Sequence, residues 1–196
     1  MTVQEPSPLD TPEWRKVPFA VQPKSSFDEL VDILLQLPSC SFKFHQLQKA
    51  EGTRLDPAGL RKDIIEQTKD LLPQLNLLSA KYPVGKFHTA FQATFAACLH
   101  AAYVICWRYF NAVSGADEVL EPRMNWHAEK ILECVHLLGS AGPHSGGSFT
   151  MSFPLKIVCL MVPDRHIRAQ AQEALYNWGS QRGLEDLCQI AVPLCT

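Results

Sequence analysis

The sequence predicts an all-α fold, an irregular multi-helix domain around one long central helix at about residues 86–112. That segment contains no Gly or Pro and almost no charge, which is typical of one uninterrupted helix. In most of the remaining chain, hydrophobic residues recur at the three- to four-residue spacing of amphipathic helices. No pair of strand-like segments, no repeat and no heptad run is present in the sequence. Together these observations favour packed helices over a sheet.

Bulky and small side chains alternate along the predicted central helix. The bulky ones are Phe91, Phe95, Leu99, Tyr103, Ile105 and Trp107, and the alanines are Ala90, Ala93, Ala96, Ala97, Ala101 and Ala102. Because apolar residues occupy most of the circumference, we expect burial on all sides, in a helix roughly 40 Å long. A membrane span of about 20 apolar residues is the alternative. Polar side chains such as His88 and His100 would be costly in lipid, which disfavours that alternative.

The chain divides into three parts by composition. Residues 1–24 contain five prolines and little periodicity, and we expect an extended arm whose Trp14 and Phe19 dock onto the domain. Residues 25–190 are expected to form the helical domain, as part of a larger domain, and residues 191–196 a tail. The arm has neither the basic start nor the apolar core of a secretory signal.

Two helices are predicted directly after the arm. Ser26 and Glu29 have the spacing of a capping box, in which each side chain satisfies a backbone N–H of the first turn. We therefore expect a helix to begin there and to end at Pro38. A shorter helix is expected over residues 42–49.

A second clear helix start is the pair Asp56 and Pro57, because Pro is tolerated in a first turn. Hydrophobic residues then follow one face and charged residues the other, as expected of a solvated outer face. Pro73 is predicted to break or kink this helix. A loop over residues 81–85 would then lead into the central helix.

Three further helices are predicted in the C-terminal half. One begins near Pro122, and the Gly- and Ser-rich segment 139–148 after it is expected to be a loop. The next starts around Pro154, and the last is capped by Asp164 and ended by Gly179 with Gly183. The inner faces of the first and last of these helices are predicted to contain His127, Ile131, Cys134, Val135 and Leu138, and Ile167, Ala171, Ala174, Leu175 and Trp178.

Charge and cysteine content argue against two classes of function. The formal net charge is −2 and basic residues are spread among acids, so the clustered Lys and Arg that bind phosphates are missing. We therefore expect no direct binding of nucleic acid. The seven cysteines form no Cys-x-x-Cys pair and most lie in apolar runs, which favours reduced, buried thiols over metal ligands.

No catalytic or metal-binding constellation is evident in the sequence. His88 and His100 are twelve residues apart on one helix, and His127 and His136 nine apart on another, so neither pair can hold one metal ion. The glycine-rich segment around His144 lacks the spacing of a phosphate-binding loop. The carboxylates lie at helix starts or on polar faces, where capping and solvation explain them. We therefore expect no enzymatic activity and no cofactor.

Aromatic residues offer one candidate binding site. Tyr103, Trp107 and Trp178 are expected in the core together with Trp126, and the first three are the candidate lining of a pocket for a small-molecule effector. Ordinary core packing is the simpler explanation of the same residues.

The order of several motifs resembles a known family. Residues 13–19, with Trp14 and Pro18, precede a Leu-rich helix over 27–38 that ends in Leu-Pro. The aromatic and Ala-rich central helix, the helix 128–138 and the Phe-Pro-Leu-Lys run 153–156 follow in order. This arrangement resembles the C-terminal regulatory domain of fungal zinc-binuclear-cluster transcription factors. The resemblance implies an all-helical regulatory region that acts in transcriptional control in the nucleus.

The chain departs from that family in two respects. The six closely spaced cysteines that hold zinc and contact DNA in such factors have no counterpart, because the first cysteine is Cys40 within the helical region. Lys156 stands where the family has Arg. The leading hypothesis is therefore a non-catalytic regulatory or interaction module without its own zinc cluster, which binds a protein partner or a second copy through exposed helical surface. The alternative is a stand-alone helical protein that binds a small molecule.

Overall fold

The computed structural model describes residues 25–49, 56–82, 89–115, 117–140 and 151–180. This part of the chain is all-helical, and no strand occurs among these residues, which confirms the predicted fold class. The helices in chain order are α1 (Ser26–Leu34), α2 (Leu37–Gln48), α3 (Pro57–Lys81), α4 (Ala90–Ser114), α5 (Asp117–Ser140), α6 (Ser152–Met161) and α7 (Arg165–Ser180).

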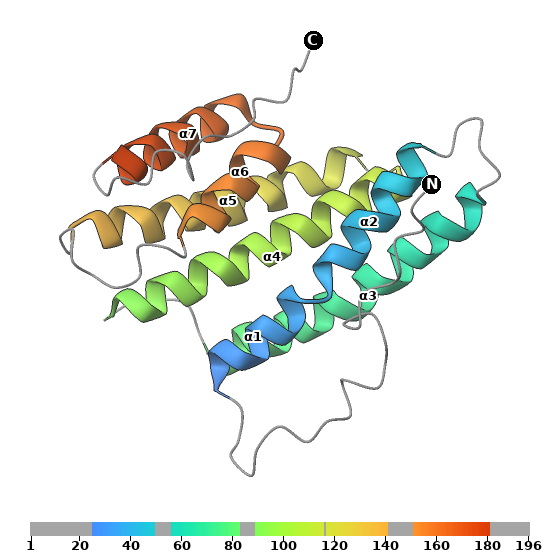
Figure 1. Cartoon of the computed structure of the whole chain (residues 1–196), viewed down its shortest axis with the longest axis horizontal. Coiled ribbons are helices and arrows are strands. Elements are labelled where there is room, and N and C mark those ends of the chain that lie inside the picture. The colour runs from blue at the N-terminus through green and yellow to red at the C-terminus, as the bar shows by residue number, and fades with distance from the viewer. Residues whose placement is uncertain (1–24, 50–55, 83–88, 116, 141–150, 181–196) are drawn as a thin grey trace, which may run out of the picture.

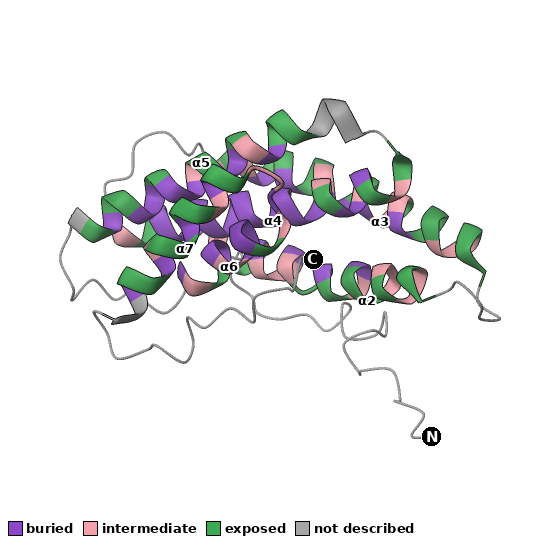
Figure 2. Cartoon of the chain, turned by 90° about the horizontal axis from the view of Figure 1, so that it is seen from above, coloured by how far each residue is buried: buried purple, intermediate pink, exposed green. Residues whose placement is uncertain are grey.

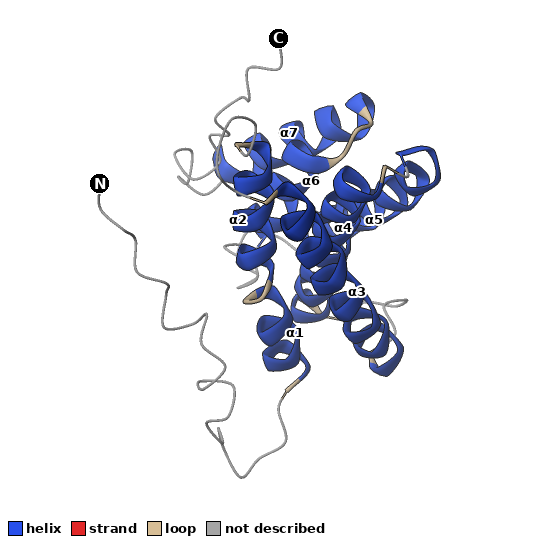
Figure 3. Cartoon of the chain, turned by 90° about the vertical axis from the view of Figure 1, so that its right-hand side faces the viewer, coloured by secondary structure: helices blue, strands red, loops and turns tan. Residues whose placement is uncertain are grey.

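Helix α4 lies at the centre of the fold. In Figure 1, α1, α2 and α3 lie on one side of α4, while α5, α6 and α7 lie on the other. Seen from the end in Figure 3, the other helices surround it. Its closest neighbours are α5, α3 and α6. Every residue from 93 to 106 is buried, and Figure 2 shows the buried residues concentrated along α4 and on the helix sides that face it. The predicted burial on all sides is confirmed for these residues, whereas Phe91, which was also expected to be buried, is 55% exposed.

Helix α4 also has the length and apolar character of a membrane span. Its most apolar 18-residue window has a mean hydropathy of 1.4, and 78% of that window is buried inside the domain. Neighbouring helices therefore already cover most of the surface that a bilayer would contact. A buried core helix has the same length and composition as a span, so α4 is weak support for membrane insertion.

The ends of α4 are set by local capping rather than by hydrophobicity. Thr89 has extended backbone angles and its hydroxyl accepts a hydrogen bond from the N–H of Gln92 at 3.2 Å, so the helix begins at Ala90. The predicted start at residue 86 was too early, and residues 86–88 lie outside the described part. At the other end Gly115 adopts a left-handed conformation with φ of 68°, which favours glycine.

The first two helices differ from prediction in their boundaries. The capping box is real but one residue earlier, because the Ser25 hydroxyl accepts from the N–H of Asp28 while the Asp28 carboxylate accepts from the N–H of Ser25. Helix α1 ends at Leu34 because Pro38 has no N–H to bond the Leu34 carbonyl. Pro38 instead lies in the first turn of α2, so α2 begins five residues before the predicted start.

Helix α3 begins as predicted and continues further. The Asp56 carboxylate accepts a hydrogen bond from the N–H of Ala58 at 3.0 Å, which confirms the predicted cap. Of the predicted break or kink at Pro73, the break does not occur, because α3 runs through this residue to Lys81, while the kink stays a prediction. Pro73 and Lys69 both lie on the exposed side, where water can bond the carbonyl that loses its partner.

The C-terminal helices follow the predicted pattern, but their ends differ from prediction. Helix α5 extends into the predicted 139–148 loop as far as Ser140, and α7 continues through Gly179, its predicted end, to Ser180. Helix α5 begins at Asp117 rather than near Pro122, which lies in its second turn and removes a single intrahelical hydrogen bond. Asp164 caps α7 as predicted, because its carboxylate accepts from the N–H groups of His166 and Ile167 at 2.7 and 3.0 Å. The predicted arm over 1–24, most of the loop over 139–148 and the segment after residue 180 lie outside the described residues.

The close packing around α4 leads to a stability prediction. Ala101 is fully buried, so we expect Ala101→Leu to force neighbouring helices apart and to lower the free energy of unfolding by about 1–3 kcal/mol. Ala112→Leu, at an exposed position of the same helix, is the matched control and should change it by less than about 0.5 kcal/mol. Urea unfolding measures both. Equal effects of the two substitutions would contradict the close packing.

Candidate functional site

Two buried histidines from different helices meet in the core. His100 lies in the middle of α4 and His127 on the inner face of α5, and their Nδ1 atoms are 2.9 Å apart. One imidazole donates its Nδ1–H and the other accepts, so the pair requires two neutral rings or one neutral ring with one charged ring. This pair was not predicted, because its two histidines belong to different helices and are far apart in the sequence. The short connection at Gly115 was the available signal, because it makes α4 and α5 antiparallel neighbours.

Aromatic rings surround the pair. The Tyr103 ring is stacked on His127 with centroids 4.4 Å apart. The Trp126 ring meets both imidazoles edge-on, with centroid distances of 5.5 Å to His100 and 4.9 Å to His127. These contacts fix the orientation of the rings, and they make the surroundings of the pair mainly apolar.

Burial sets the charge of both histidines. Removal from water lowers the pKa of His100 below its usual value, and the positive charge of Lys130 lowers it further, while Glu133 acts in the opposite direction. Burial also lowers the pKa of His127, and repulsion from His100 adds to the effect. Both rings are therefore neutral near pH 7. Each Nδ1 is occupied by the other ring, so the pair acts as a hydrogen-bonded link between α4 and α5.

Tyr103 connects the same cluster to a third helix. Its hydroxyl donates a hydrogen bond to Oδ1 of Asn76 on α3 at 2.7 Å. Burial raises the pKa of Tyr103 to about 12, so the hydroxyl stays protonated and remains a donor. The cluster of His100, Tyr103, Trp126 and His127, with Asn76, thus links α3, α4 and α5 through polar contacts.

The three residues of the predicted effector pocket lie in two parts of the fold. Tyr103 and Trp107 are one turn apart on α4, and the half-buried Trp107 has the Arg123 guanidinium 5.2 Å from its ring centroid. Trp178 is buried near the C-terminal end of α7, which packs on α5 and α6. Figure 1 shows that end of α7 at the side of the molecule where α4 begins, whereas Trp107 lies in the last third of α4. The structure therefore brings Tyr103 and Trp107 to neighbouring turns and Trp178 elsewhere.

One aromatic residue is not where sequence reasoning placed it. Trp126 was expected in the core, but it is 51% exposed. It lies at the boundary of the core, where its ring contacts the histidine pair and the Lys130 ammonium. Its position at the core boundary follows from its place beside the inward-facing His127, one residue later in the same helix.

The buried thiols behave as small hydrophobic side chains. Five cysteines in the described residues are free and buried, namely Cys40, Cys98, Cys106, Cys134 and Cys159. Burial raises the pKa of Cys98 and Cys106 to about 12, so these thiols are protonated and poor ligands or nucleophiles near pH 7. Among the described residues, no group of three or more His, Cys, Asp or Glu side chains is arranged to hold a metal ion.

Comparison with known proteins adds no relative. No protein-family model, no curated protein and no solved structure matches the chain.

The buried histidine pair predicts a specific pH dependence of stability. Because the pKa of each histidine is lower in the folded chain than its ordinary value of 6.5, the unfolded chain binds more protons below that pH. The contribution of the two neutral histidines to the free energy of unfolding is thus fully present above pH 6.5. As the pH drops below this value, the free energy of unfolding falls by up to about 1.4 kcal/mol per pH unit for each histidine. Urea unfolding from about pH 7 to about pH 5 measures this slope, a range above the ordinary carboxylate pKa values.

A double substitution tests whether the histidine pair causes this pH dependence of stability. His100→Leu with His127→Phe removes both polar partners together, and should flatten the slope without leaving an unpaired buried group. The exposed His45, changed to Gln, is the control and should leave the slope as in the wild type. An unchanged slope in the double variant would show that the pair is not the source.

Proposed function

We propose that this chain is a non-catalytic regulatory or interaction module of a fungal transcription regulator, acting in the nucleus without a DNA-binding zinc cluster of its own. The proposal is supported by the order of motifs that resembles the regulatory domain of zinc-binuclear-cluster factors, and by the all-helical architecture around α4. The polar groups gathered around the histidine pair are neutral and are bonded to one another, which favours a structural over a chemical role for them.

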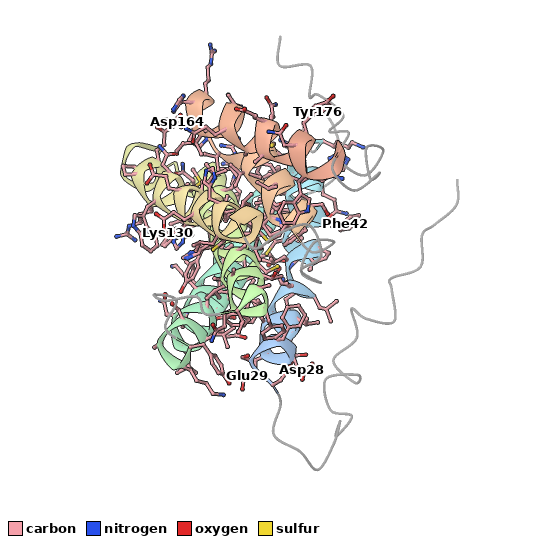
Figure 4. The ribbon with its side chains drawn as sticks, turned by 90° about the vertical axis from the view of Figure 1, so that its left-hand side faces the viewer. Asp28, Glu29, Phe42, Lys130, Asp164 and Tyr176 are labelled. Carbon is pink, nitrogen blue, oxygen red and sulfur yellow. The ribbon has the colours of Figure 1, made fainter. Side chains whose placement is uncertain are left out.

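The observation that carries the proposal is the number of large hydrophobic side chains on the outside. Aromatic residues held in exposed positions are enriched at the centres of protein–protein interfaces. Figure 4 shows two of them, Phe42 on α2 and Tyr176 on α7, pointing away from the helices. The exposed large hydrophobic residues are Leu35, Phe42, Leu77, Phe91, Trp126, Leu137, Phe153, Leu160 and Tyr176.

Surface charge favours a protein partner over nucleic acid. Lys43, Lys62, Lys81 and Lys130 are each paired with a carboxylate, so they do not form a basic strip along the described helices. Phosphate binding depends on such strips. Contacts with a protein surface need only apolar anchors within a mixed polar rim, which these helices provide.

Fusion to a heterologous DNA-binding domain tests the proposed role. We expect the fused chain to change transcription of a reporter several-fold relative to the DNA-binding domain alone in a fungal host. Leu99→Asp, which places a charge at a fully buried site of α4, is the control and should abolish the effect by unfolding the domain. Equal reporter output from the fusion and from the DNA-binding domain alone, at equal protein levels, would contradict the proposal. A fluorescent fusion of the chain should also accumulate in the nucleus.

A further inference from the structure

We propose that the outer face of α5 is self-complementary and pairs two copies of this chain antiparallel through Trp126, Lys130, Glu133 and Leu137. This inference names one partner, a second copy, and one surface for the proposed interaction role, and it rests on that role. We call these four residues the α5 stripe.

The α5 stripe has the spacing of a helix–helix seam. Successive members are four, three and four residues apart, eleven residues over three steps, which is close to the length of one helical turn and places them in one line along the helix. Trp126 is 51% exposed and Leu137 is 48% exposed. The opposite side of α5 faces the core through Ala128, Ile131, Cys134 and Leu138. The stripe thus places two large apolar side chains in solvent at its ends, with two opposite charges between them.

The charges of the stripe are already held in place. The Lys130 ammonium is 2.6 and 2.8 Å from the two carboxylate oxygens of Glu133, and it lies 5.8 Å from the centroid of the Trp126 ring. The side chains of Lys130 and Glu133 keep 35% and 55% of their exposure, so both can reach a facing helix. Figure 4 shows Lys130 pointing outward from α5, and Figure 2 shows exposed residues along the outer side of that helix.

Antiparallel pairing satisfies every member of the stripe. A symmetric dimer requires a surface that is complementary to itself. With the two-fold axis between Ile131 and Leu132, Trp126 faces Leu137 of the second copy, and Lys130 faces Glu133 of the second copy. Each of these contacts then occurs twice. Parallel pairing in register would place lysine against lysine and glutamate against glutamate, which is unfavourable. The order of the charges therefore selects the antiparallel dimer.

The expected dimer is weak. The stripe covers about three helical turns, which is less than the surface of a standard stable interface. Association should accordingly depend on protein concentration, and it should weaken in high salt because an ion pair lies at its centre. A weak dimer suits a module whose copies also meet other proteins.

Charge reversal at the stripe tests the inference with the full chain. Sedimentation velocity over a range of concentrations should show a monomer–dimer equilibrium for the wild type. Lys130→Glu alone gives each copy two acids in the stripe, and Glu133→Lys alone gives two lysines, so each single variant should be monomeric. An equimolar mixture of the two single variants should form a heterodimer. The double variant, which exchanges the two charges, should form a homodimer like the wild type.

Helix α3 offers matched controls. Lys62 and Glu66 form an exposed ion pair one turn apart, with 3.8 Å between the ammonium and the carboxylate. Lys62→Glu and Glu66→Lys therefore change the net charge and break a surface pair as the stripe variants do, but should leave the dimer intact. Circular dichroism compares folding among all variants. Recovery of association on mixing the single variants also shows that each is folded.

Three results would overturn the inference. A wild type that is monomeric at every concentration would exclude the dimer. Single variants that still dimerise would exclude the α5 stripe as the interface, and failure of the mixed variants to associate would exclude charge pairing between positions 130 and 133 of the two copies. The reporter assay with the fused chain is independent of all three. If the wild type is monomeric but the fused chain changes reporter transcription, only this inference is rejected. If the wild type dimerises but the fused chain leaves reporter transcription unchanged, the proposed function is rejected.

Discussion

The fold depends on the burial of one helix around its whole circumference. Helix α4 can contact five other helices because alanines such as Ala96, Ala97 and Ala101 let their backbones approach closely, while Leu99 and Val104 fill the remaining space. A helix with this composition has no side that water can favourably cover. The other helices therefore have to close around α4, and their own polar faces become the surface of the domain.

Two buried polar residues of α4 form hydrogen bonds to neighbouring helices within this apolar core. A single buried imidazole would need a hydrogen-bond partner, and His100 finds one in His127 of the neighbouring helix. Tyr103 finds another in Asn76 of α3. These bonds form only in one register of α3, α4 and α5, so they select the native packing among arrangements that apolar contacts alone would allow. Because His100 and Tyr103 are engaged in this way, function is most simply sought at the outer faces.

The parts of the fold that depend on local sequence were predictable. Asp56 and Asp164 were identified as caps because a carboxylate directly before a helical pattern accepts hydrogen bonds from N–H groups of the first turn. The burial of α4 followed from its composition. Features that depend on tertiary contacts were not. The pairing of His100 with His127, for example, needed the antiparallel register of two helices. The relative positions of the predicted pocket residues also depend on tertiary packing, since Trp178 belongs to a helix that packs on α5 and α6.

Native-state hydrogen exchange of α4 tests the central claim most directly. If the domain is built around this helix, amides within residues 93–106 should exchange only by global unfolding, with opening free energies equal to the free energy of unfolding and the same dependence on denaturant. Amides of the outer helices should exchange through smaller local openings. Exchange of the α4 amides at lower free energies than those of α3 or α7 would contradict the account, because the central helix would then not be the element on which the others depend.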